Sequence, residues 1–179
     1  MPSNPLPTNM PNTSELALIP RPSRRISGDP YLKFQLAPDT IAALNMRQIQ
    51  EVRILPIHRL TPIPNMLPHV LGLINQRSQV QWAIDLAQLV GFPGLGTNLR
   101  QYEMLLIRTG AIAFGLAVQK IETAIWVPRD SVQPIPKQVS PTLFPFLQGC
   151  MTQEQTVALI FDTETISQAA MTMTDRLRE

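Results

Sequence analysis

Proline divides this chain into short pieces, and that spacing limits what it can fold into. The chain has 179 residues and 18 prolines, and seven of these prolines lie within residues 1–30. Proline removes a backbone donor and fixes φ, so neither a helix nor a sheet propagates through it. Residues 1–30, where Ser, Asn and Thr stand between the prolines, are therefore predicted to be a disordered tail. One apolar island, at residues 16–19, interrupts this tail.

Beyond the tail, large apolar residues alternate with polar or small ones, which is the period of a half-buried strand. This alternation predicts strands at 31–36, 40–44, 69–75, 80–84, 104–108, 111–118, 121–127 and 157–161. Apolar residues three apart predict a helical turn at 46–52, followed by an extended segment at 53–57. Short helices are predicted at 86–90 and from residue 162 or 163 to about 171. Many short strands with few helices are typical of an all-β fold built from small barrels.

Two barrels suit the pattern better than one, because a loop rich in Gly and Pro at 92–100 separates two groups of strands. We therefore expect one domain over residues 31–170, divided into two subdomains at 92–100, and a C-terminal tail at 171–179. The short helix before this loop has signals at both ends. Asp85 can accept a backbone N–H as its N-cap, and Gly91 after its end tolerates positive φ.

Side chains that could carry catalysis or hold a metal are sparse and scattered. Cys150 is the single cysteine, and its neighbours in sequence offer no base, so a buried structural thiol is expected. His58 and His69 stand eleven residues apart across several prolines, which is not a metal-ligand spacing. The glycines at 91–96 lack the Lys-Ser/Thr of a phosphate loop. The sequence therefore predicts a protein that is not an enzyme, with no cofactor and no metal.

Composition bounds the remaining classes of function. Apolar residues make up 44% of the chain and charged residues 16%, which favours a globular domain. The formal net charge is +2, with Lys and Arg scattered and few aromatic residues, so nucleic acid is not expected as a partner. No apolar run is long enough to cross a membrane, and the N-terminus lacks a secretory pattern. A cytoplasmic protein is therefore expected.

Three stretches of the chain together resemble the CheW family of chemosensory coupling proteins. The first is Ile-Gln-Glu-Val-Arg at 49–53. The second, at 64–86, contains Gly-Leu-Ile-Asn and ends in Asp-Leu after an extended segment. The third combines Gly-Leu-Ala-Val at 115–118 with Ile121 and the later Pro-Ile-Pro at 134–136. The chain departs from the family pattern at four positions in these stretches: Gln76 for Leu, Ser78 for Gly, Trp82 for Pro and Gln119 for Asp.

The resemblance implies two side-by-side SH3-like five-stranded β-barrels with short helices. It also implies a non-catalytic adaptor or scaffold that couples a methyl-accepting chemoreceptor to a CheA-type histidine kinase in a two-component chemosensory array. One barrel would pair with the regulatory domain of the kinase, and the groove between the barrels would take the receptor tip. Contact with the membrane would be peripheral, through the receptor array. Control of type IV pilus motility or of phototaxis is the output we favour.

Nine residues of this chain are expected to contact a partner or to support the fold. Receptor or kinase contacts are expected at Arg77, Glu51, Ile49 and Val118, with Val52 as a further apolar candidate. Glu51 could pair with Arg77. Structural roles are expected at Gly72, Gly115, Asn75 and Asp85, where the two glycines would permit close approach of other groups.

Other classes of function remain open at this point. A nucleic-acid-binding β-barrel would need a basic, aromatic-rich face, which the sequence does not display. Another protein-binding barrel, or the regulatory end of a signalling kinase, would share the fold. A small hydrolase is the least favoured alternative.

Overall fold

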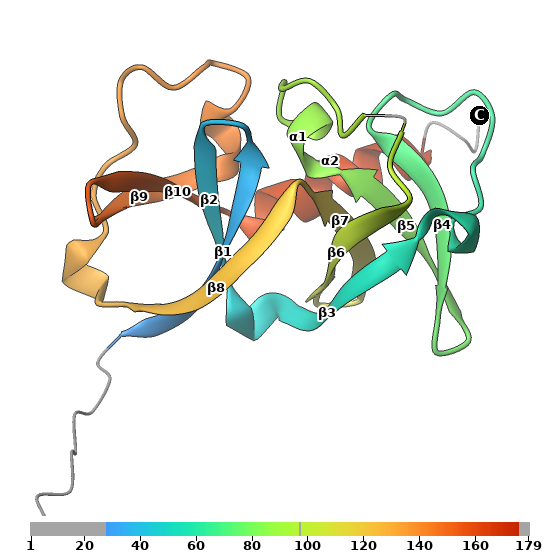
Figure 1. Ribbon diagram of the computed structural model, residues 1–179, viewed down its shortest axis with the longest axis horizontal. Helices are drawn as coiled ribbons and strands as arrows, with labels where there is room; N and C mark the ends of the chain where they lie inside the picture. The colour runs from blue at the N-terminus through green and yellow to red at the C-terminus, as the bar shows by residue number, and fades with distance from the viewer. Residues whose placement is uncertain (1–27, 97, 176–179) are drawn as a thin grey trace, which may run out of the picture.

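The described residues form two five-stranded sheets that lie side by side (Figure 1). The computed structural model describes residues 28–96 and 98–175. Sheet A has the strand order β8-β1-β2-β10-β9, and sheet B has the order β3-β6-β7-β5-β4. The elements of sheet A are β1 (Asp29–Ala37), β2 (Thr40–Asn45), β8 (Lys120–Val127), β9 (Leu147–Gln153) and β10 (Thr156–Phe161). Those of sheet B are β3 (Ile49–Pro56), β4 (Val70–Gln76), β5 (Gln79–Asp85), β6 (Gln101–Thr109) and β7 (Ile112–Val118).

Helices are short and join or cover the sheets. The two α-helices are α1 (Leu86–Leu89) and α2 (Thr163–Asp175), and α2 passes behind the sheets (Figure 1). The 3-10 turns in the described part of the chain are η1 (Met46–Gln48), η2 (Ile57–Arg59), η3 (Arg129–Ser131) and η4 (Phe144–Phe146). The prediction of an all-β fold with two five-stranded units and short helices is confirmed.

A single two-hydrogen-bond bridge joins the opposite edges of each sheet. In sheet B, the chain leaves edge strand β3 through η2, and Thr61 then pairs with Leu73 of the other edge strand, β4, with both N···O distances at 2.8 Å. In sheet A, the chain leaves β8 through η3, and Gln133 pairs with Cys150 of β9 at 2.8 and 2.9 Å. A proline follows Thr61 and Gln133 and fixes φ there, which disfavours an extended strand, and each closure is limited to one residue pair.

The two halves of the chain repeat the same sequence of elements. Each half consists of a hairpin, an edge strand with its 3-10 turn, a second hairpin and a helix capped by Asp. Both halves also carry the spacing Pro-x5-Pro-Ile-Pro, at 56–64 and 128–136. The first hairpins are exchanged: β1 and β2 of the first half complete sheet A, and β6 and β7 of the second half complete sheet B. Each sheet is therefore made from both halves.

This exchange corrects the predicted boundary at 92–100. That loop separates the two halves of the sequence but joins α1 to β6 within the same side of the molecule, since β5 and β6 both belong to sheet B. The chain passes between the sheets at η1, before β3, and again between β7 and β8. Local composition marks a loop, whereas membership of a sheet depends on long-range pairing.

The structure also differs from the sequence-based prediction at four smaller points. The helical turn predicted at 46–52 is limited to η1, and β3 already begins at Ile49. Strand β9 was not predicted, because it follows a proline-rich stretch. The predicted C-terminal tail begins too early, since α2 continues to Asp175. Of the predicted N-terminal tail, residues 1–27 lie outside the described part of the chain, and β1 already begins at Asp29.

The main core lies between the two sheets and beneath the helices. It combines Leu32, Phe34 and Leu36 of β1 with Leu105 and Ile107 of β6, together with Phe114, Leu116, Phe161 and Ile166. Phe34 and Phe161 contact each other with ring centroids 6.4 Å apart. The apolar surface buried here stabilises both sheets at once, because neither sheet covers its inner face alone.

We predict that a methyl group beside either bridge destabilises the fold. A Cβ on Gly72, where φ is +143°, would overlap the Thr61 carbonyl, and a Cβ on Gly149 would lie 2.6 Å from the Gln133 oxygen. We expect Gly72→Ala to lower the free energy of unfolding by about 2–4 kcal/mol and Gly149→Ala by about 1–3 kcal/mol. Urea denaturation measures both. Gly96→Ala is the control, because nothing lies within 4 Å of a Cβ there; equal losses at all three positions would contradict the prediction.

Candidate functional site

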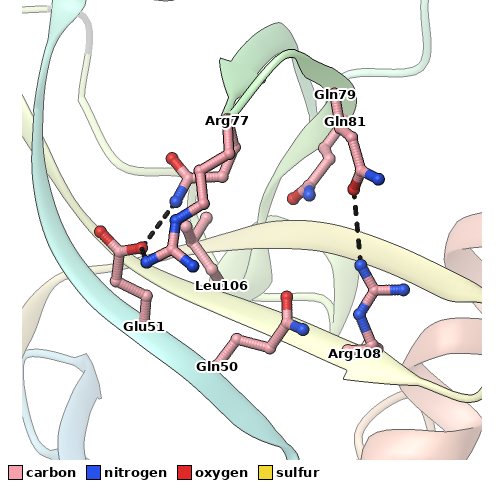
Figure 2. Close-up of a pocket in the computed structure, with 8 residues that line it drawn as sticks. Gln50, Glu51, Arg77, Gln79, Gln81, Leu106 and Arg108 are labelled. Carbon is pink, nitrogen blue, oxygen red and sulfur yellow. Dashed lines mark hydrogen bonds and ion pairs between the residues drawn. The ribbon is translucent and has the colours of Figure 1, made fainter.

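A polar hollow of about 330 Å³ opens where the two edges of sheet B meet (Figure 2). Its lining comes from β3, from the β4–β5 hairpin and from β6. The lining residues are Gln50, Glu51, Gln76, Arg77, Gln79, Gln81, Leu106 and Arg108. Strands β3 and β4 are the two edges of sheet B. The bridge from Thr61, after β3, to Leu73 of β4 brings these edges together, so residues of both line the hollow.

Glu51 is the central acceptor of this hollow. The side-chain nitrogen of Gln76 donates to Glu51 Oε2 at 2.6 Å. Arg53, on the same strand, lies 2.9 Å from Oε1 through Nη2 and donates to it through Nε at 3.1 Å. Arg77 Nη2 stands 3.6 Å from Oε2, so the expected Glu51–Arg77 pair is present as a loose ion pair. Glu51 therefore ties β3 to the β4–β5 hairpin, while the Arg77 side chain remains 85% exposed.

The hairpin that carries Arg77 is a tight turn with two left-handed residues. Arg77 has φ +47° and Ser78 has φ +66°, which is the pattern of a type I′ turn. Neither residue is a glycine, so the turn forms at a backbone cost of about 1 kcal/mol or more. This conformation directs Arg77 out to the rim of the hollow.

Two glutamines in the lining hold oxygens without a hydrogen-bond partner. Gln76 is 7% exposed and Gln81 is 6% exposed, and the Oε1 atom of each is buried and unpaired. On the opposite side of the hollow, Arg108 Nη2 lies 3.5 Å from Gln79 Oε1, as drawn in Figure 2. The hollow thus combines buried acceptors with arginine donors at its rim. Sequence reasoning did not single out Gln81 or Arg108, since strand pairing alone places them here.

The apolar contact residues expected from the sequence lie mostly inside. Val118 is 2% exposed in the core between the sheets, which corrects its expected place in a receptor groove. Ile49 is half-buried and packs against the same core. The exposed apolar side chains of β3 are instead Val52 at 48% and Ile54 at 58%. Alternation along β3 turns these two residues to the same face.

The expected structural residues occupy distinct places. Asp85 is buried, caps α1 by accepting from Gln88 N at 3.1 Å, and also accepts from Leu95 N at 2.6 Å. A Cβ on Gly115 would meet side chains, with Met104 Cε at 2.6 Å, so this glycine makes room for core packing. Asn75 is exposed on β4 and lines a separate hollow with Arg53 and Arg59.

Asp85 also influences two ionisable neighbours. Burial lowers the pKa of His69 from its usual value, and the negative charge of Asp85 opposes this shift. Burial raises the pKa of Tyr102, and the charge of Asp85 adds to the increase. Both effects lie within the framework of sheet B and outside the lining of the hollow.

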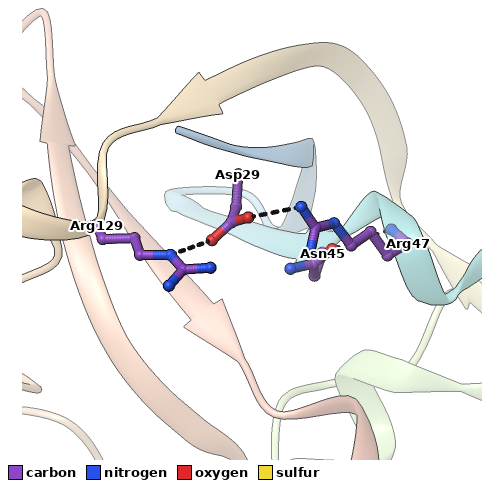
Figure 3. A network of polar contacts seen from close by, with 4 residues as sticks. All are labelled: Asp29, Asn45, Arg47 and Arg129. Carbon is purple, nitrogen blue, oxygen red and sulfur yellow. Dashed lines mark hydrogen bonds and ion pairs between the residues drawn. The ribbon is translucent and has the colours of Figure 1, made fainter. Parts of the chain in front are cut away.

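A second polar cluster fastens the start of β1 (Figure 3). Asp29 lies 3.1 Å from Arg47 Nη2, in η1, and 3.1 Å from Arg129 Nε, in η3. Asn45 caps η1 by accepting from Arg47 N at 2.9 Å. The arginines are largely exposed, so each ion pair contributes at most about 1 kcal/mol. This cluster positions the first crossing between the sheets.

The cysteine, the possible metal ligands and the helices were also considered from the sequence. Cys150 is buried, and its thiol donates to the Pro134 carbonyl at 3.3 Å. Among residues 28–96 and 98–175, no group of three or more His, Cys, Asp or Glu side chains is placed to hold a metal ion. Within the same ranges, no helix is long and apolar enough to cross a membrane.

The family model described as a CheW-like domain matches residues 30–171. The chain belongs to the CheW-like family. No curated protein matches the chain at the level of sequence. Solved structures are similar in fold, among them the scaffolding protein TtCheW from Thermoanaerobacter tengcongensis, with a TM-score of 0.66 and 21% identity over 75% of this chain and 89% of that one. The two five-stranded sheets of this CheW-like domain therefore have a counterpart in a known scaffolding protein.

We predict that removing the Glu51 carboxylate loosens the hairpin. Glu51→Ala leaves the buried Gln76 nitrogen without its acceptor, so we expect the free energy of unfolding to fall by about 1–2 kcal/mol. Glu122→Ala on β8 is the matched control, because its partly exposed ion pair with Lys33, at 3.5 Å, contributes about 0.5 kcal/mol or less. Urea denaturation compares the two variants. A larger loss for Glu122→Ala would contradict the central role of Glu51.

Proposed function

We propose that this CheW-like chain is a non-catalytic adaptor that couples a methyl-accepting chemoreceptor to a CheA-type histidine kinase. Membership of the CheW-like family supports a scaffold role in chemosensory signalling. The adaptor would transmit receptor state by holding its partners in a fixed arrangement rather than by covalent chemistry.

The proposed receptor contact is supported mainly by the exposed Arg77 side chain. It is 85% exposed at the rim of the polar hollow, on a turn anchored through Glu51 and Gln76. A planar guanidinium on a fixed turn can engage a partner's carboxylate or carbonyl with two parallel hydrogen bonds. An arginine on an anchored turn loses less conformational entropy on binding than one on an unanchored loop. We therefore propose the hollow around Arg77 as the receptor-facing site.

The exposed apolar face of β3 is the proposed contact for the kinase. Val52 and Ile54 expose side chains next to each other on an edge strand. Apolar side chains of this kind supply the desolvated centre of a protein interface. The hollow and this face both involve β3, so one strand would carry contacts to both partners. Type IV pilus motility or phototaxis remains the output we propose for the array.

We predict that Arg77→Ala weakens recovery of the receptor and leaves the kinase bound. In a pull-down from the lysate of its own cells, we expect receptor recovery to fall about tenfold, which corresponds to the loss of one strong interface contact. Arg129→Ala is the control, because its side chain is 83% exposed but lies away from the hollow. Recovery of nucleic acid or unrelated enzymes in place of these partners, unaffected by Arg77→Ala, would refute the adaptor proposal.

We predict the complementary result for Ile54→Lys. A lysine on this face would have to be desolvated in the interface, so we expect kinase recovery to fall about tenfold while receptor recovery is retained. Val157→Lys is the control, since Val157 is 46% exposed on β10 of sheet A. The same pull-down measures both variants. Unchanged kinase recovery with Ile54→Lys would remove β3 from the proposed kinase interface.

A further inference from the structure

We propose that the β3 face of sheet B docks an acidic, amphipathic segment of its protein partner, through arginines that stand among exposed apolar side chains. This inference rests on the proposed function, because it names the chemistry of the partner that binds at this face. It is supported by the distribution of charge between the sheets, by arginines without an ion pair among the described residues, and by a hollow between β3 and β4.

Charge divides unevenly between the two sheets. The described residues that build sheet B, 49–96 and 98–118, contain five arginines and three acidic residues, a formal net charge of +2 with histidine neutral. Those that build sheet A, 28–48 and 119–175, contain five basic and eight acidic residues, a formal net charge of −3. Complementary charge steers a partner to its surface and rejects one of like sign. Sheet B is therefore the half of the described structure that suits an acidic partner.

The three acidic side chains of sheet B already have partners within the fold. Glu51 accepts from Gln76 and Arg53. Asp85 is buried and accepts backbone N–H groups at the start of α1 and in the loop that follows. Glu103 Oε2 accepts from a backbone nitrogen at the start of β8. The acidic residues of this sheet therefore leave the positive charge around η2 without compensation.

Two arginines beside η2 have no carboxylate within 4 Å in the part of the chain that the structure describes. Arg59 ends η2, and Arg100 directly precedes β6. The Arg100 carbonyl accepts from Ile57 N at 3.0 Å, which brings the two arginines to the same end of sheet B. Both side chains are exposed, and the exposed His58 lies beside them. This end of the sheet is therefore basic and open to a partner.

The separate hollow between β3 and β4 lies at this end and measures about 340 Å³. Arg53, Arg59 and Asn75 supply the long polar side chains of its lining, and Ile54 and Pro56 supply apolar surface. Glu51 holds the Arg53 guanidinium at 2.9 Å, whereas Arg59 has no such restraint. A carboxylate side chain that enters this hollow would meet guanidinium and amide donors.

Exposed apolar side chains stand among these arginines. Ile54 is 58% exposed, Ile57 is 41% exposed and Leu99 is 39% exposed. Each is next in sequence to an arginine or a histidine. A protein interface combines an apolar centre with a polar rim, so a matching partner needs apolar side chains as well as carboxylates. An acidic segment that is also amphipathic has both.

The type of cation favours a protein over a phosphate-bearing surface. Residues 49–118 contain arginine but no lysine. The planar guanidinium pairs with a carboxylate through two parallel hydrogen bonds, and arginine is enriched in protein interfaces where lysine is depleted. Anionic lipids bind larger clusters, of about four to eight Lys or Arg residues. We therefore assign the face to an acidic protein segment.

Nuclear magnetic resonance of the full chain tests this inference with blocked peptides. The probe is acetyl-Glu-Leu-Glu-Leu-Glu-Leu amide, and the comparison peptide carries lysine in place of each glutamate. A peptide of this size binds with a Kd on the order of 1 mM, so each is added to about 5 mM. We expect the glutamate peptide to shift the Nε–H signals of Arg59 and Arg100 and the methyl signals of Ile54. We expect the lysine peptide to leave all three unchanged.

Two matched pairs of substitutions separate this face from the net charge of the protein. Arg59→Glu with Arg100→Glu reverses the charge beside η2, and we expect it to weaken binding of the glutamate peptide about tenfold or more. Lys120→Glu with Lys137→Glu makes the same change in net charge at exposed positions of the other half, and we expect binding to change less than about twofold. Thermal melting checks that both variants fold.

Four results would overturn the inference. They are equal or tighter binding of the lysine peptide, no shift with either peptide, equal losses from the two pairs of substitutions, and shifts of the same signals with phosphatidylserine vesicles but not with the glutamate peptide. The last result would assign the face to a membrane surface. Shifts of these signals with protein concentration alone would assign it to a second copy of this chain and would also overturn the inference.

These outcomes are separate from those of the adaptor proposal. If the glutamate peptide fails while kinase recovery still depends on Ile54, the acidic-segment inference is wrong and the adaptor proposal stands. If the peptide binds as expected but no kinase is recovered, the face recognises acidic segments and the assignment of the partner is wrong.

Discussion

One pair of hydrogen bonds closes each sheet, and the remaining structure depends on these two closures. Thr61 bridges to Leu73 in sheet B, and Gln133 bridges to Cys150 in sheet A. Each bridge lies between a proline, which fixes φ next to the bridging residue, and a glycine, which lets the two backbones approach. Without closure, the edge strands would present unpaired N–H and C=O groups, which is a recognised route to aggregation. The proline-rich loops of the sequence are therefore part of how the sheets end.

The exchange of hairpins between the two halves makes the molecule cooperative. Sheet A needs β1 and β2 from the first half, and sheet B needs β6 and β7 from the second, so neither sheet is complete from one half. The core between the sheets draws on both, as in the contact of Phe34 with Phe161. We infer that the halves unfold together, and that folding is slow for a domain of this size because four of the eight strand pairs join segments that are distant in sequence.

Local signals in the sequence predicted the strands well and their partners poorly. Alternation located β7 and β8, and the Asp85 and Gly91 signals bounded α1, because these depend on neighbouring residues alone. The alternation around Val118 could not distinguish a surface groove from the core between two sheets, since a strand packed in either place shows the same pattern. The loop at 92–100 was recognised as a boundary, but exchange of the hairpins moved the sheet boundary elsewhere. The resemblance located Glu51 and Arg77, whereas Gln81 and Arg108 reach the hollow through pairings that no local pattern reveals.

The two halves share a turn conformation but differ in the side chains at that turn, so the candidate site is found once in the described structure rather than twice. The β9–β10 turn has the same backbone as the β4–β5 turn, with φ +47° and +68° at Glu154 and Gln155 against +47° and +66° at Arg77 and Ser78. The same scaffold therefore presents an acidic residue on sheet A and a basic one on sheet B. Backbone geometry alone does not choose a partner, since it is shared. The choice must come from the side chains, and on sheet B these are an exposed arginine on a turn that is anchored through Glu51 and Gln76.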